Sequence, residues 1–180
     1  IPETKKYLDR VRDVFCFCCF TGIRYSDVYN LRRSNIKEDA IEITTVKTDD
    51  SLRIELNKYS SELLNRYKDL RFPNDKALPV ISNQKMNDYL KELMQLCGID
   101  TPETVVYFKG NKRYEETYPK YELIGTHTAR RTFICTALSM GVPPTVLMSI
   151  TGHKTFESMK PYINATNQDR KKALEMFNDL

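Results

Sequence analysis

The chain has 180 residues, and its 28 Lys and Arg against 24 Asp and Glu leave a net charge of only +4 near pH 7. This length fits one domain with a sizeable core, and so small a positive charge permits a nucleic-acid partner without arguing for one. No stretch approaches the roughly 18 apolar residues of a membrane span, and no signal peptide opens the sequence, so we expect a cytoplasmic protein. Because the sequence begins with Ile1, we expect it to be a piece of a longer protein.

Five cysteines are present, and three of them crowd into FCFCCF at positions 16, 18 and 19. No second pair of cysteines stands at metal-ligand spacing. We therefore interpret the cysteines as buried thiols that pack as small hydrophobic side chains, rather than as zinc ligands or a disulfide.

The first 31 residues predict two helices joined by a tight turn. Apolar residues at three- and four-residue steps predict an amphipathic helix over residues 2–20, which Gly22 should stop. Ser26 is expected to cap a short second helix that carries Val28 and Leu31. Arg24 would then lie in the turn, with its backbone fixed from both sides.

Two alternating, β-branched runs follow, AIEITTV (40–46) and LRIEL (52–56), and they predict a hairpin with Lys47 at its tip. Further helices are predicted over residues 58–69, 83–97, 126–140, 142–152 and 166–178, with a short one around Pro161 and a weaker hairpin over 105–117. In this scheme Thr126 caps its helix. The expected fold class is mainly α with small β-hairpins (α+β).

The segment GTHTARRTF places His127 and Arg130 three residues apart, on one face at the start of a predicted helix. A helix N-terminus adds free amide donors and partial positive charge, so this pair would suit a phosphate oxygen. Such pairs are common by chance, so taken alone this one is better explained as an ordinary surface His and Arg.

Three segments occur in order along the chain: TGIRYSDV around Arg24, THTARR around His127 and Arg130, and GHKTFESMKPY from His153 to Tyr162. In this set the sequence resembles the tyrosine recombinase family, the phage integrases and their relatives. The family carries an Arg in a T-G-x-R-x-S-E turn, an H-x-x-R pair, and a Gly-His followed nine residues later by a nucleophilic Tyr. It also carries a Lys at a hairpin tip, the place of Lys47 in TVKTDD.

The resemblance covers essentially residues 1–180 and implies the C-terminal catalytic domain of a tyrosine recombinase, with N-terminal DNA-clasping domains outside this chain. It implies a DNA breaking and rejoining enzyme that works through a 3′-phosphotyrosine intermediate without metal, ATP or cofactor. The catalytic residues carried over are Arg24, Lys47, His127, Arg130, His153 and the nucleophile Tyr162. For other tyrosines, such as Tyr25 and Tyr107, we expect a partly buried ring with a hydrogen-bonded hydroxyl.

The sequence departs from the family pattern at a few positions. Asp27 and Val28 replace the more usual Glu and Leu, Arg131 stands where a His is common, and Thr151 replaces the Leu before Gly-His. None of these changes removes a reactive group. The segment GHKTFESMKPYI looks most like the integrases of conjugative transposons.

The partner implied by the resemblance is double-stranded DNA in the bacterial cytoplasm, bound by a homo-tetramer that is monomeric when free and works with host accessory proteins. Phosphate contacts are expected from Arg131, Lys154 and Lys112, although exposed lysines are equally often ordinary surface residues. The last helix, with Leu174 and Phe177, would pack on its own domain or on a neighbouring protomer.

Three alternatives stay open at this point. A type IB topoisomerase has a similar catalytic set, and a DNA-binding module could keep the fold without catalysis. Metal-dependent hydrolysis through His127 and His153 would require activity to vanish with a chelator. The target DNA sequence cannot be read from these residues.

Overall fold

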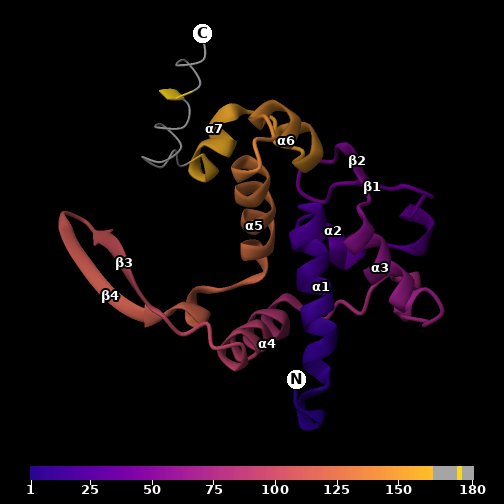
Figure 1. Ribbon diagram of the computed structural model, residues 1–180, viewed down its shortest axis with the longest axis horizontal. Coiled ribbons are helices and arrows are strands. Elements are labelled where there is room, and N and C mark those ends of the chain that lie inside the picture. Colours follow the sequence, from indigo (N-terminus) through magenta and orange to yellow (C-terminus); the bar gives the residue numbers. More distant parts are fainter. Residues whose placement is uncertain (164–173, 176–180) are drawn as a thin grey trace. The chain divides into compact units, whose positions relative to one another are not determined.

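The computed structural model describes residues 1–163 and 174–175, and it divides the chain into two compact units, residues 1–133 and 134–180. Within the described residues there are seven α-helices and two separate antiparallel hairpins (Figure 1). The predicted class, mainly α with small hairpins, is therefore confirmed.

Helix α1 (Tyr7–Thr21) supplies the centre of the first unit's core and follows a short 3-10 turn. It ends at Gly22, whose φ of 68° is left-handed and whose N–H donates to the Cys18 carbonyl at 2.9 Å. A Cβ atom at this position would lie 2.5 Å from the Phe133 ring. Both the backbone conformation and the lack of space therefore require glycine here.

Helix α2 (Tyr25–Asn30) begins at once after that turn, with Arg24 at the N-cap position. The prediction that Ser26 caps this helix is wrong, because Ser26 already lies in the first turn and the Arg24 carbonyl accepts the first helical N–H groups. Val28 lies on this helix as predicted, whereas Leu31 directly follows it, and both side chains are buried.

Strands β1 (Ala40–Thr44) and β2 (Ser51–Glu55) form the first hairpin and turn their isoleucine and leucine side chains into the core. Their connecting loop is organised by Thr45, whose N–H donates to the Asp50 carbonyl at 2.9 Å and whose hydroxyl lies 2.8 Å from that of Thr48. Lys47 is exposed in this loop, which confirms its place at the hairpin tip.

Helices α3 (Lys58–Tyr67) and α4 (Asn83–Leu96) pack against α1. Strands β3 (Pro102–Lys109) and β4 (Lys112–Pro119) form a second hairpin that is longer than predicted. Its two-residue turn begins with Gly110 at a φ of 61°, the conformation that such hairpin turns demand at this position (Figure 1).

Helix α5 (Thr126–Ser139) starts one residue earlier than a Thr126 cap requires, so that prediction is wrong. The cap is Gly125, whose N–H donates to the Thr128 hydroxyl at 3.1 Å. The Thr126 N–H is instead accepted by the side chain of Asn87 on α4, at 2.9 Å. A tertiary contact has thus replaced the local cap.

The second unit contains α6 (Pro144–Thr151), α7 (Phe156–Met159) and a 3-10 turn over Lys160–Tyr162. Helix α6 ends at Gly152, with a φ of 66°. The predicted interruption at Pro161 corresponds to the change from α7 to the 3-10 turn. The predicted helix over 166–178 lies outside the described residues, except for the helical Leu174 and Glu175.

The cysteines are free thiols, and the prediction that they are buried holds only in part. Cys18 is buried and Cys16 and Cys19 are half-buried, and burial raises the pKa of all three thiols. Cys97 and Cys135 are exposed, because they lie on the solvent side of their segments. Among the described helices, none has the length and apolar character to cross a membrane.

Candidate active site

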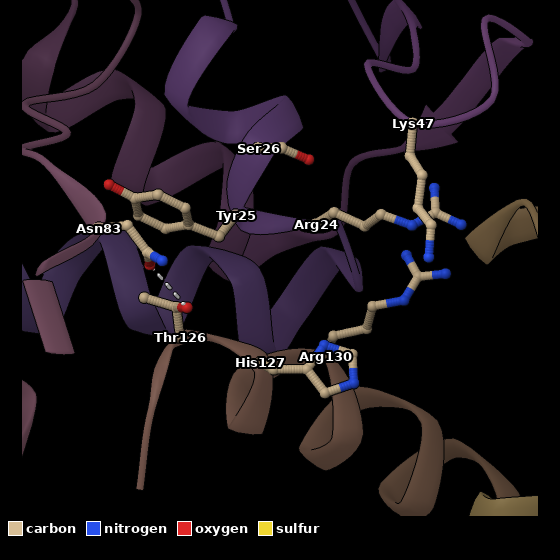
Figure 2. Close-up of a pocket in the computed structure, with 8 residues that line it drawn as sticks. All are labelled: Arg24, Tyr25, Ser26, Lys47, Asn83, Thr126, His127 and Arg130. Atoms are coloured by element: carbon tan, nitrogen blue, oxygen red, sulfur yellow. Dashed lines mark hydrogen bonds between the residues drawn. The ribbon is translucent and has the colours of Figure 1, made fainter.

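Four of the six predicted catalytic residues line one cleft of about 330 Å³ in the first unit (Figure 2). They come from three segments far apart in the sequence: the turn after α1, the β1–β2 loop and the first turn of α5. The lining consists of Arg24, Tyr25, Ser26, Lys47, Asn83, Thr126, His127 and Arg130. Three cations and an imidazole suit an anion and are a poor set of ligands for a metal ion.

Arg24 is positioned by its own turn and by a buried carboxylate. Its side chain is only 18% exposed, and Nη1 lies 3.8 Å from Oδ2 of Asp27. The other oxygen of Asp27 accepts the Val46 N–H at 2.8 Å. Asp27 therefore connects the turn that carries Arg24 with the loop that carries Lys47.

Asp27 is a site residue that the sequence reasoning missed as such. It was recognised only as a replacement for Glu in the family pattern. The three-residue spacing from Arg24, which allows an ion pair on one helical turn, was the available indication.

Arg130 is almost completely buried, with 3% of its surface exposed. Its Nη1 donates to the Gly22 carbonyl at 2.8 Å. The end of α1 therefore places Arg24 in the cleft and also orients the guanidinium of Arg130. Figure 2 shows the side chains of Arg24, Lys47 and Arg130 reaching toward the same side of the cleft.

His127 lies in the first turn of α5 and is exposed as a residue, yet its ring loses part of its water against the cleft wall. This loss of water lowers the pKa of His127 below 6.5, and the positive charges of Arg130, Arg131, Arg24 and Lys47 lower it further. His127 is consequently neutral near pH 7 and can accept a proton.

The remaining lining residues form a polar framework. The Thr126 hydroxyl donates to Oδ1 of Asn83 at 3.1 Å, which fixes the start of α5 to the start of α4 (Figure 2). The Tyr25 hydroxyl donates to the Ile81 carbonyl, and burial raises the pKa of Tyr25 to about 12. Tyr25 thus stays neutral, and its half-buried, hydrogen-bonded ring is as predicted. The same holds for Tyr107, which is half-buried and donates its hydroxyl to Glu116 on β4.

The other two predicted residues, His153 and Tyr162, are neighbours in the second unit. Their ring centroids lie 5.9 Å apart and the ring planes meet at 61°, an edge-to-face arrangement. His153 follows the end of α6, and Tyr162 closes the 3-10 turn after α7. Both side chains are half-buried. Although nine residues separate them in the sequence, His153 and Tyr162 therefore lie next to each other in the folded chain.

The expected phosphate-contacting residues Arg131, Lys154 and Lys112 are all exposed. Other basic residues in and next to the β3–β4 hairpin are engaged locally. Arg113 on β4 pairs with Glu115 at 2.5 Å, and Lys120, just after β4, pairs with Glu103 at 3.1 Å. Within the part of the chain that the structure describes, no group of three or more His, Cys, Asp or Glu side chains could hold a metal.

The sequence profile of the phage integrase family matches residues 2–169. The chain belongs to this family, the tyrosine recombinases. The resemblance drawn from the three motifs and Lys47 is thereby confirmed. None of the curated proteins matches the sequence.

Solved structures of other family members share the fold. The crystal structure of XerA recombinase matches with a TM-score of 0.63 at 17% identity, over 98% of this chain and 64% of that one. XerH recombinase bound to a palindromic difH substrate gives 0.70 at 14% identity, over 99% and 48%. The Tn1549 transposon integrase in complex with circular intermediate DNA gives 0.60 at 14%, over 97% and 63%.

The chain thus spans about half to two thirds of the length of these structures. At such low identity the similarity establishes the fold, namely that of the recombinase catalytic domain.

Proposed function

We propose that the chain is the catalytic domain of a site-specific DNA recombinase that breaks and rejoins DNA through a 3′-phosphotyrosine bond at Tyr162. The observation that carries this proposal is the gathering of Arg24, Lys47, His127 and Arg130 in one cleft. Family membership and the His153–Tyr162 pair support it.

Arg24 and Arg130 would hold the scissile phosphate. Each guanidinium is planar and can donate two parallel hydrogen bonds to phosphate oxygens, which an ammonium group cannot do. Because Asp27 and the Gly22 carbonyl orient these groups before DNA arrives, little reorganisation is needed as charge develops on the phosphate.

Tyr162 must lose its proton to attack. An ordinary tyrosine has a pKa of about 10, so its phenolate costs about 4 kcal/mol near pH 7. The positive guanidinium groups of Arg24 and Arg130 would offset part of this cost, and a neutral His127 would accept the proton. The lowered pKa of His127 keeps it in the form that such an acceptor requires.

In the cleavage step the Tyr162 oxygen forms a bond to phosphorus while the bond from phosphorus to the 5′-oxygen breaks. Lys47 would give its proton to that leaving 5′-oxygen, and His153 would donate a hydrogen bond to a non-bridging oxygen. The phosphodiester energy is retained in the tyrosine ester, so a 5′-hydroxyl of another strand can reverse the step without ATP. The proposal requires the phenol to reach the phosphate held in the cleft.

The arginines would supply the positive charge that Mg²⁺ supplies in most phosphoryl transfer, so we expect the reaction to continue in EDTA. The substrate would be double-stranded DNA in the cytoplasm. We further propose that strand exchange takes place in a homo-tetramer on DNA, with phosphate contacts from Arg131, Lys154 and Lys112.

The test is incubation of the protein in EDTA with a pool of DNA duplexes that carry a 5′-bridging phosphorothiolate, whose cleavage product cannot be rejoined. We expect a covalent protein–DNA adduct that withstands denaturation and is absent with Tyr162→Phe. An adduct that persists in Tyr162→Phe, or one that forms only with added Mg²⁺, would contradict the proposal. Relaxation of supercoiled DNA without exchange of partners would favour a type IB topoisomerase.

A further inference from the structure

Thr151, the last residue of α6, is buried beneath His153. Only 1% of its surface is exposed. Its hydroxyl oxygen makes two close contacts: 2.5 Å to the Leu147 carbonyl oxygen and 2.6 Å to Nδ1 of His153. These two contacts together determine where the protons lie.

A threonine hydroxyl has one hydrogen to donate and two lone pairs to accept with. The Leu147 carbonyl can only accept, and two oxygens at 2.5 Å repel each other unless a proton lies between them. The single Thr151 proton must therefore point to Leu147. The contact with His153 then needs its proton from Nδ1, because the hydroxyl can only accept there.

The end of α1 contains the same arrangement with a donor of known identity. The Thr21 hydroxyl donates to the Phe17 carbonyl at 2.7 Å and accepts the backbone N–H of Ile23, two residues on, at 3.5 Å. At the end of α6 the Thr151 hydroxyl oxygen again contacts a nitrogen of the residue two positions on, which here is Nδ1 of the His153 ring. A backbone N–H always carries its proton, so Thr21 supports the same assignment for Thr151.

The backbone of His153 is fixed independently of its ring. Its N–H donates to the Met148 carbonyl at 3.0 Å, across the left-handed Gly152. With the backbone held by this turn and one ring nitrogen held by Thr151, the imidazole has little freedom to rotate. In this tautomer Nε2 carries the lone pair, so it is the nitrogen that would take up a second proton.

We propose that Thr151 is a positioning residue that holds neutral His153 in the Nδ1–H tautomer and so presents Nε2 to the substrate. The tautomer follows from the contacts of the chain alone. The role of Nε2 toward a phosphate oxygen rests on the proposed function. Donation from Nε2 requires a second proton there, taken from solvent, which gives an imidazolium. The Leu that is usual in the family at this position offers no such acceptor.

The first experiment measures the tautomer directly on the DNA-free chain. Long-range ¹H–¹⁵N correlation spectra, recorded about two pH units above the ordinary histidine pKa, distinguish a protonated ring nitrogen from an unprotonated one. The chain has only two histidines, so His127→Gln assigns the remaining signals to His153. We expect a proton on Nδ1, and a proton on Nε2 would overturn the proposal.

The second experiment removes the acceptor without changing the shape of the side chain. In Thr151→Val we expect neutral His153 to shift to the Nε2–H form or to a mixture. We also expect the rate of adduct formation to fall by about 10-fold, because the ring is no longer held in place and the imidazolium loses the acceptor of its Nδ1 proton. Thr151→Ser restores the hydroxyl and should restore both. An unchanged tautomer in Thr151→Val would overturn the proposal, as would a Ser variant that behaves like the Val variant.

A matched control separates positioning from helix stability. Thr132 on α5 is exposed and donates its hydroxyl to the Thr128 carbonyl at 2.9 Å, so Thr132→Val removes the same kind of helical hydrogen bond. We expect it to leave the His153 tautomer unchanged, and a tautomer shift in this control would overturn the assignment to Thr151. If the tautomer behaves as expected but no adduct forms at Tyr162, the proposed function fails while the role of Thr151 stands.

Discussion

Two helix ends in this chain are built in the same way and deliver different chemistry. Helix α1 ends in TGIR, residues 21–24, and α6 ends in TGHK, residues 151–154. In both, the threonine hydroxyl donates to the carbonyl four residues earlier, and the glycine is left-handed, with φ of 68° and 66°. In both, the hydroxyl also contacts the residue two positions on.

The difference lies in which residue after the glycine carries the chemistry. At the first end Ile23 is 1% exposed and fills the core, and Arg24 reaches the cleft. At the second end His153, the proposed catalytic residue, is half-buried, and Lys154 is exposed. The turn fixes the course of the backbone, whereas the burial of the first residue after the glycine decides which of the two side chains remains available.

The largest expected effect is at the first end. Arg24→Lys keeps the charge but loses the planar fork, so we expect adduct formation to slow by about 100- to 1000-fold. Lys154→Ala, at the equivalent position, should weaken DNA binding and flatten its salt dependence without slowing the step in the bound complex. Single-turnover cleavage at saturating protein checks both. Comparable rates for the two variants would show that the ends are not used differently.

The next largest effect is expected on replacing the two glycines, Gly22 and Gly152, by alanine, and it is an effect on stability. Gly22→Ala places a methyl group 2.5 Å from the Phe133 ring and a side chain in left-handed backbone, and we expect a loss of about 3 kcal/mol in the free energy of unfolding. Gly152→Ala also places a side chain in left-handed backbone, a strain of about 1 to 2 kcal/mol. Urea unfolding measures both. A loss for Gly22→Ala no larger than this strain would mean that the Phe133 contact is relieved without cost.

The threonines are expected to differ less. Thr21→Val and Thr151→Val each lose one hydrogen bond to a helix carbonyl, about 1 kcal/mol. Thr151→Val should cost somewhat more, because the imidazole proton also loses its acceptor. The same urea titration decides this, with the tautomer spectrum as the second readout. A smaller loss for Thr151→Val than for Thr21→Val would argue against a genuine His153 contact.

The smallest effect is the pH dependence of stability that comes from His127, which lines the cleft together with Arg24. Because loss of water and the nearby cations lower the pKa of His127 in the folded chain, the unfolded chain binds this proton first as the pH falls below about 6.5. The free energy of unfolding should therefore decrease from about pH 6.5 down to the folded-state pKa. His127→Gln should remove that part of the slope, which stability curves at several pH values would reveal.

Much of the fold could be predicted because periodicity and turn residues are local properties. The apolar stripe of α1, the β1–β2 alternation and the stop at Gly22 all lie where the sequence placed them. The helix starts were less accurate. Ser26 and Thr126 are good capping residues, but the tight turn before α2 and the Asn87 side chain on α4 supply the actual partners.

The candidate site could be predicted as a set of residues but not as a set of contacts. The motifs identify Arg24, Lys47, His127 and Arg130 without saying what orients them. Asp27 lies only three residues from Arg24, but its contact with Val46 beside Lys47 is long-range. The contact between the Gly22 carbonyl and Arg130 is long-range as well, so only the folded chain brings these groups together. Thr151 was noticed only as a departure from a pattern. Its importance depends on two distances that no sequence pattern contains.

The central claim is that Tyr162 becomes covalently joined to DNA. Protease digestion and mass spectrometry of the trapped adduct test it most directly, since they identify the modified residue. The account predicts a nucleotide attached through phosphate to the peptide that contains Tyr162, with EDTA present throughout. A nucleotide on any other residue, or cleaved DNA with no peptide attached, would contradict it.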